Sequence, residues 1–156
     1  MKISANGNMC EATLVSTWSL FGEHLTGERC GIFVVVSSVL LDGEARDALN
    51  STAKTFGYGQ AACTFAQVQG AHDTNLDAAA LRLLVEGLDP YCIVVTDAAA
   101  GQMLGEAYRT QLAPNSAARI MGRSVVALDS FESQLKSAQD KQVAWALLKT
   151  LPRCEG

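Results

Sequence analysis

The chain has 156 residues, of which 49% are hydrophobic, 18% charged and 6% aromatic, and its formal net charge is −4. This length and hydrophobic content predict one domain over residues 1–156 with a substantial core. The few aromatic residues argue against a groove of stacking platforms for nucleic-acid bases, and the net charge gives no general attraction for phosphate backbones.

Membrane insertion and secretion are not expected. The longest apolar run, 32–41, is interrupted by Ser37 and Ser38, whereas a transmembrane helix needs about 20 apolar residues. Residues 1–8 do not begin a signal peptide. The five cysteines form no C-x-x-C pair and have no histidine at metal-ligand spacing. We therefore expect reduced thiols in a cytoplasmic protein, with no membrane partner, metal site or cofactor; the cysteines are Cys10, Cys30, Cys63, Cys92 and Cys154.

Three short apolar runs, 32–36, 61–68 and 91–95, are each followed by residues with helical spacing and a helix-capping side chain. Continuous apolar strands that alternate with helices are typical of a parallel sheet covered on both faces. The pattern predicts an α/β fold, a three-layer α/β/α domain with a mostly parallel central sheet of about four strands. A flavodoxin-like doubly wound domain is the alternative.

The helices are expected in chain order at the following places. Asn8 can cap a first helix, with Leu14, Val15, Trp18 and Phe21 on its inner side; Asp42 opens a second, and Thr74 or Asn75 a third that closes at Asp89-Pro90. Asp97 caps a fourth helix, Asp129 or Ser130 a short one, and Asp140 starts the last. Residues 118–121 and 124–128 form either a hairpin or one bent strand with a bulge at Gly122.

Ligands of parallel α/β folds gather beyond the carboxyl ends of the strands, so the residues there are the candidate ligand-binding set. These candidates are Ser37, Ser38, Gln67, His72 and Asp97. Each also has a structural interpretation, because the serines suit a turn and Asp97 suits a helix cap. His72 and Asp73 form the only histidine–carboxylate neighbourhood on a predicted loop beyond a strand end, whereas His24 is expected at the surface.

Basic residues are concentrated late in the chain. Residues 1–108 carry 5 Lys or Arg against 12 Asp or Glu, a net charge of −7, while residues 109–156 carry 7 against 4, a net charge of +3. Solvated helix faces explain such a bias, and a basic surface for nucleic acid is the alternative. Its members would be Arg109, Arg119, Arg123, Lys136 and Lys141.

Several segments, taken in order, resemble the uracil-DNA glycosylase superfamily, particularly its iron–sulfur branch. Residues 32–36 are similar to the family's first strand. Residues 88–100 resemble the family's succession of a proline, a strand, a turn of small residues and a helix. The closing K-x-x-x-W-x-x-L-K helix of the family is matched by Lys141, Trp145, Leu148 and Lys149. The matched residues are scaffold positions, which imply the fold more than the chemistry.

The motifs that carry the family's chemistry are missing. Residues 37–41 stand in place of the family's G-E-x-P-G-like loop. The family's uracil-reading asparagine would fall near Ala66 or Gln67. The family's late histidine has no counterpart, because no histidine follows His72. The close cysteine pair of the cluster is also absent. The resemblance therefore implies a glycosylase-like domain without base excision, since a polarised water and a donor to the leaving base are lacking.

The sequence thus predicts a non-catalytic, glycosylase-like domain that binds a small ligand or protein partner around Ser37, Ser38, Gln67 and Asp97. Two alternatives remain open. One is an enzyme with a rearranged, hydrolase-type site in which His72, Asp73 and Asp97 converge. The other is a weak nucleic-acid-binding protein that uses the five basic residues.

Overall fold

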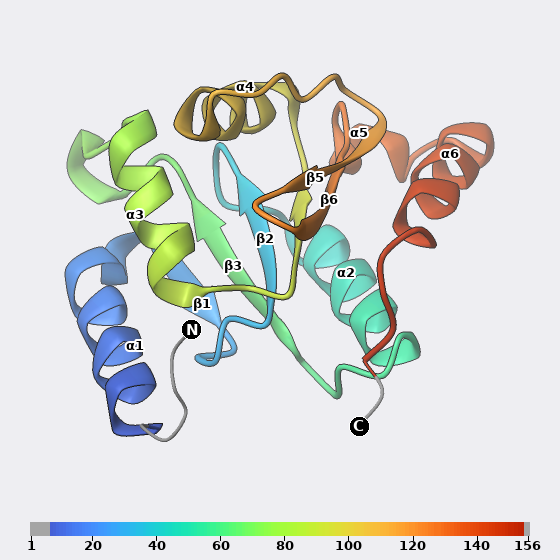
Figure 1. The fold of residues 1–156 in the computed structure, drawn as a ribbon. Coiled ribbons are helices and arrows are strands. Elements are labelled where there is room, and N and C mark those ends of the chain that lie inside the picture. The colour runs from blue at the N-terminus through green and yellow to red at the C-terminus, as the bar shows by residue number, and fades with distance from the viewer. Residues whose placement is uncertain (1–6, 155–156) are drawn as a thin grey trace.

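A six-stranded sheet lies between two layers of helices in the computed structural model (Figure 1), which describes the backbone of residues 7–154 and the side chains of 13–72 and 74–154. The order of the strands across the sheet is β1-β3-β2-β4-β6-β5. β2, β3, β4 and β6 are parallel, and the edge strands β1 and β5 run antiparallel to their neighbours. The strands are β1 (Leu25–Gly27), β2 (Phe33–Ser37), β3 (Cys63–Gln67), β4 (Cys92–Val95), β5 (Ser116–Ile120) and β6 (Arg123–Ala127).

The helices cover both faces of the sheet, so the three-layer α/β/α prediction is confirmed. One face packs against α1 (Gly7–Phe21), α3 (Ala78–Leu88) and α4 (Ala98–Tyr108). The other packs against α2 (Gly43–Thr55), α5 (Phe131–Gln134) and α6 (Ala138–Leu148), on the right in Figure 1. Among residues 7–154, no helix is both long enough and apolar enough to cross a bilayer.

The alternating direction of side chains along β2 builds two separate cores. Val34 and Val36 belong to the core under α1, α3 and α4, whereas Phe33 and Val35 belong to the core under α2, α5 and α6. All four side chains are completely buried. A strand buried on both faces must be apolar at every position, which is why the three predicted strands appear as unbroken hydrophobic runs.

The connection of the parallel strands creates one topological switch point. The chain passes from β2 to β3 on one side, and then crosses back to β4 on the other side of β2. In chain order the parallel strands therefore lie as second, first, third and fourth, as in the corresponding part of a flavodoxin-like sheet. At the carboxyl edge, β2 leads to α2 on one face and β4 leads to α4 on the other, and such a point is where α/β folds bind ligands.

The caps predicted at Asp42 and Asp97 are confirmed. The Asp42 carboxylate accepts a hydrogen bond of 2.9 Å from the backbone N–H of Ala45, and the Asp97 carboxylate one of 2.8 Å from Ala100. The hairpin alternative for the later strands is also confirmed. Met121 and Gly122 both have positive φ angles, 53° and 82°, as a type I′ turn requires.

Three predicted helix starts are wrong. α3 is capped by Asp77 rather than Thr74 or Asn75, because Asn75 is still extended and pairs with Gln69. α6 is capped by Ser137, which places Asp140 inside its first turn. Asn8 likewise lies within α1. The short helix α5 does begin after Ser130, as predicted, although the Ser130 side chain forms no capping hydrogen bond. On α1, Val15 is 50% exposed and does not join the inner stripe.

Candidate functional site

The structure brings together two of the five predicted site residues, Ser38 and Asp97, at the switch point. The Ser38 backbone N–H donates to Asp97 Oδ2 over 2.8 Å, and Ser38 Oγ donates to Asp97 Oδ1 over 2.5 Å. Asp97 Oδ1 also caps α4. Both carboxylate oxygens are therefore occupied by groups of the protein itself.

The loop after β2 is fixed at three points above the carboxyl edge. Besides the bond to Asp97, the carbonyl of Ser38 accepts from the backbone N–H of Gln69 at 2.9 Å. The backbone N–H of Asp42 donates to Glu132 Oε2 at 2.7 Å. Val39 and Leu40 are exposed between these anchors. The loop is thus hydrogen-bonded to the residues that follow β4 and β3 and to α5, at the place where a ligand crevice was predicted.

The other two strand-end candidates are held in place by the backbone. Ser37 is buried, and its carbonyl accepts from the N–H of Val68 at 2.9 Å. The side-chain amide of Gln67 donates to the carbonyl of Gln69 at 2.8 Å. The carbonyl of Gln67 accepts from His24 Nδ1 at 2.9 Å, since a carbonyl can only accept. His24 is buried, so the expectation of a surface histidine is wrong; it belongs to η2 (Gly22–His24), which packs beside β3.

His72 lies apart from this network. It is exposed in η3 (Ala71–Asp73), where its φ of 56° places it in the left-handed region. Among the described residues, its side chain forms no hydrogen bond with Ser37, Ser38, Gln67 or Asp97. The side chain of Asp73 is outside the described residues. The geometry therefore gives no support to a converging set of His72, Asp73 and Asp97.

The five basic candidates are distributed over three places. Arg109 follows α4 as its C-terminal cap. Arg119 and Arg123 lie on the β5–β6 hairpin, and Arg123 forms ion pairs of 2.9 Å with Glu86 and 2.8 Å with Asp89. Lys136 and Lys141 border a groove between α2 and α6. These residues do not build one continuous basic surface, and the charge of Arg123 is already balanced.

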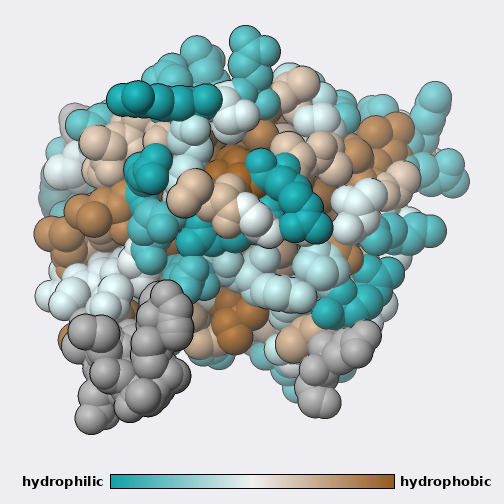
Figure 2. Space-filling model, viewed as in Figure 1, coloured by the Kyte–Doolittle hydropathy of each residue, from teal (hydrophilic) through white to brown (hydrophobic). Residues whose placement is uncertain are grey.

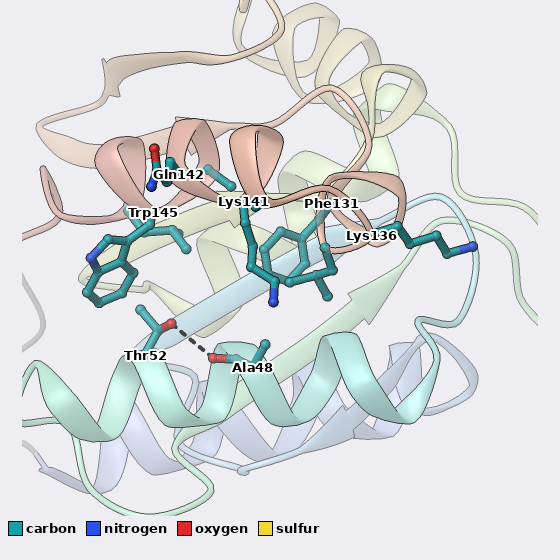
Figure 3. A pocket seen from close by; sticks show the side chains of 11 residues that line it. Ala48, Thr52, Phe131, Lys136, Lys141, Gln142 and Trp145 are labelled. Atoms are coloured by element: carbon teal, nitrogen blue, oxygen red, sulfur yellow. Dashed lines mark hydrogen bonds between the residues drawn. The ribbon is translucent and has the colours of Figure 1, made fainter.

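The groove between α2 and α6 has a volume of about 540 Å³ (Figure 3). Its base and walls are formed mainly by apolar side chains, with polar groups at the rim. The lining residues are Ala48, Thr52, Phe131, Leu135, Lys136, Ala138, Lys141, Gln142, Ala144, Trp145 and Leu148. This volume and composition fall within the range of small-molecule and peptide-side-chain sites in proteins.

Two side chains of α6 give the groove its chemistry. In Figure 3, Lys141 and Trp145 extend from α6 toward α2, whereas Lys136 points away at one end. Trp145 is 40% exposed and stacks against Phe56 at a ring distance of 5.8 Å. Thr52 on the opposite wall donates its hydroxyl to the carbonyl of Ala48 at 2.9 Å. The lining contains no carboxylate, so the groove combines apolar surface with positive charge.

No pattern in the sequence predicted this groove. The glycosylase-like motif implied only scaffold roles for Lys141, Trp145 and Lys149. Of that motif only Leu148 is buried. The spacing of Lys141, Trp145 and Lys149 at intervals of four residues was the available signal, because such residues share one helix face.

No cluster of three or more histidine, cysteine or acidic side chains suited to a metal ion occurs within the described part of the chain. Cys63 and Cys92 are free thiols, buried at the start of β3 and β4. Comparison of the chain with protein-family models and with curated proteins yields no match.

Proposed function

We propose that this protein is a non-catalytic, uracil-DNA-glycosylase-like domain that binds a partner through the groove between α2 and α6. The observation that carries the proposal is the open apolar groove with positive charge on one rim. The other support comes from the carboxyl edge, where two predicted ligand-binding residues, Ser38 and Asp97, bond to each other.

Base excision requires a pocket for the extruded base, a polarised water and a donor to the departing anion. Asp97, the carboxylate at the carboxyl end of β4, has both oxygens in hydrogen bonds to Ser38 and Ala100. A carboxylate held in this way stabilises a helix start and a loop rather than activating water. This arrangement supports a binding role over a hydrolytic one.

The lack of catalysis is tested with single-stranded DNA that contains uracil. We expect no release of free uracil above that of a sample without protein, even at equimolar protein and DNA. Release of the base, abolished by Asp97→Asn, would contradict the non-catalytic assignment and favour an enzyme with a rearranged site.

Occupancy of the groove is tested with the fluorescent dye anilinonaphthalene sulfonate, which joins an aromatic body to one negative charge. We expect saturable binding to the folded protein. Ala48→Phe, which places a ring in the groove, should weaken this binding at least about tenfold, because it removes the space that the dye occupies.

Ser51→Phe is the matched control for Ala48→Phe. It introduces the same ring on the same helix, at an exposed residue outside the groove lining. Equal binding of the dye by both variants and by the wild type would overturn the assignment of the groove as the binding site.

A further inference from the structure

The chemistry of the groove identifies the kind of partner, and this inference rests on the proposed function. Lys141, Trp145 and Lys149 follow one another along α6 at intervals of four residues, and all three are exposed. Lys149 Nζ lies 5.9 Å from the centre of the Trp145 ring. With a rise of about 1.5 Å per residue, the two lysines are about 12 Å apart along the helix axis. The α6 side of the groove therefore presents Lys141 and Trp145, and Lys149 lies outside the lining itself but next to the Trp145 ring.

No ion pair within the described part of the chain neutralises these positive charges. Among the described residues, Lys136, Lys141 and Lys149 form no ion pair, and the groove lining contains no acidic residue. The protein as a whole is acidic, with a net charge of −4. A local positive patch on an acidic protein favours a negatively charged partner surface. It disfavours positively charged partner surfaces, because like charges repel.

The base of the groove selects for apolar side chains. Phe131, Ala144 and Leu148 are buried residues of the core under α2, α5 and α6, and they reach the groove from below. The α2 wall presents the small side chains of Ala48 and Thr52. Figure 2 shows hydrophobic residues at the surface next to α6, among mostly hydrophilic ones. Alanines at the wall leave room for larger side chains of a partner to enter.

We infer that the occupant is an amphipathic helix of a partner protein that carries two carboxylates about eight residues apart. Its carboxylates would meet Lys141 and Lys149, and the leucine-like side chains between them would enter the groove beside Trp145. Binding of an apolar helix face in a groove between helices is an established mode of peptide recognition. The spacing of the carboxylates follows from the 12 Å between the lysines and the common rise of both helices.

Single-stranded nucleic acid fits these features less well. Phosphates would gain from the lysines, but the apolar base offers nothing to a sugar-phosphate chain. One side of the Trp145 ring is also stacked against Phe56, which leaves a single platform instead of the series that nucleic-acid grooves provide.

The experiment is a titration of the 156-residue chain with a short helical peptide that carries two glutamates eight residues apart and leucines between them. Binding is measured by fluorescence anisotropy of a dye on the peptide. We expect saturable binding that weakens as salt is added, and loss of at least about tenfold in affinity when both glutamates are replaced by glutamine. Equal binding of the glutamine peptide would overturn the charge recognition.

Charge-reversal variants of the protein distinguish recognition at the groove from a general effect of net charge on binding. Lys141→Glu combined with Lys149→Glu should weaken peptide binding about tenfold or more. Lys54→Glu together with Arg109→Glu reverses the same number of charges at exposed residues outside the groove lining, and should weaken binding only slightly. Similar losses in both double variants would overturn the inference.

The outcomes distinguish this inference from the proposed function. If the dye binds in the groove but the peptide does not bind, the partner assignment falls while the groove remains the site. If a thymidine oligonucleotide binds more tightly than the peptide, the partner is a nucleic acid and the inference falls. If neither dye nor peptide binds, both the inference and the proposed function fall.

Discussion

Asp97 is the residue on which the carboxyl edge of the sheet depends. Its carboxylate joins the start of α4 to the loop after β2, through the N–H of Ala100 and both polar groups of Ser38. Other aspartates of the chain cap helices without such a long-range bond; Asp77 caps α3 from an exposed position. Asp77 therefore only caps its helix, whereas Asp97 caps its helix and also forms a tertiary contact.

The substitution Asp97→Ala should destabilise the protein by about 2–4 kcal/mol, because it removes a cap and leaves two donors of Ser38 without their acceptor. Asp77→Ala, which removes only a cap, should cost about 1 kcal/mol. Urea denaturation of the two variants measures the difference. Equal losses of stability would mean that the Ser38 contact contributes nothing.

The C-terminal segment is held by close backbone packing against the chain after α2. The N–H of Cys154 donates to the carbonyl of Phe56 at 2.8 Å, and Tyr58 donates its hydroxyl to the carbonyl of Pro152 at 2.6 Å. Gly57 has a φ of +93°, and a Cβ there would overlap the carbonyl oxygen of Cys154. A side chain at position 57 would therefore strain the backbone and overlap the carbonyl group of Cys154.

Gly57→Ala should therefore be more destabilising than Gly59→Ala. Gly59 has a φ of +108° but open space around it, so its substitution should cost only about 1 kcal/mol of backbone strain. We expect Gly57→Ala to cost at least about 1 kcal/mol more, seen as a lower Tm in thermal unfolding. Equal Tm values would show that the C-terminal segment moves away at no cost.

At the scale of elements, a polar network joins α3, the end of α4 and the β5–β6 hairpin. Glu86 accepts from the Tyr108 hydroxyl at 2.6 Å and from Arg123 at 2.9 Å, and Arg123 also pairs with Asp89. Burial alone would raise the pKa of Glu86, but the bonds from Arg123 and Tyr108 outweigh it and hold that pKa below its ordinary value of 4.5. The network thus depends on an ionised Glu86.

This lowered pKa gives a pH dependence with a definite sign. The contribution of ionised Glu86 to stability is complete above the unfolded-state pKa of 4.5 and is lost as the pH falls through the lower folded-state pKa. Glu86→Gln should therefore be less stable than the wild type at neutral pH, with a difference that shrinks below pH 4.5. Urea titrations across pH measure it, and Glu106→Gln, at an exposed residue of α4, is the control.

At the scale of the whole molecule, two cores share one sheet. Cys63 and Cys92 begin β3 and β4 and are buried in the core under α2, α5 and α6. Burial raises the pKa of the Cys63 thiol to about 12 and that of Cys92 to about 11. Cys30 is exposed and Cys154 half-buried. Access to the thiols therefore reports on the opening of the whole domain.

Alkylation with iodoacetamide near neutral pH should accordingly modify Cys30 and Cys154 in the folded protein and spare Cys63 and Cys92. The thiolate is the reactive form, and a raised pKa together with burial leaves almost none of it accessible. Peptide mass spectrometry over time measures each site, with a urea-unfolded sample as the control. Rapid modification of Cys92 in the folded protein would contradict this burial.

The sequence by itself determined three of the four parallel strands, β2, β3 and β4, and the starts of α2 and α4. Their signals are local, because a strand buried on both faces is apolar at each position and an aspartate caps the helix that follows it directly. β1, Leu25–Gly27, was missed because two of its three residues are exposed, so it shows no hydrophobic run. The start of α3 was placed too early because the pairing of Gln69 with Asn75 keeps the chain extended, which depends on a loop closing on itself.

Only the tertiary structure decided what the strand-end residues and the last helix do. Ser38 and Asp97 are 59 residues apart, so sequence placed both at one edge but could not show that they bond to each other. The groove, in turn, is a space left between α2 and α6, whose facing residues Ala48 and Trp145 are far apart in the chain. A space between helices is set by the positions of both on the sheet, and no local pattern encodes that separation.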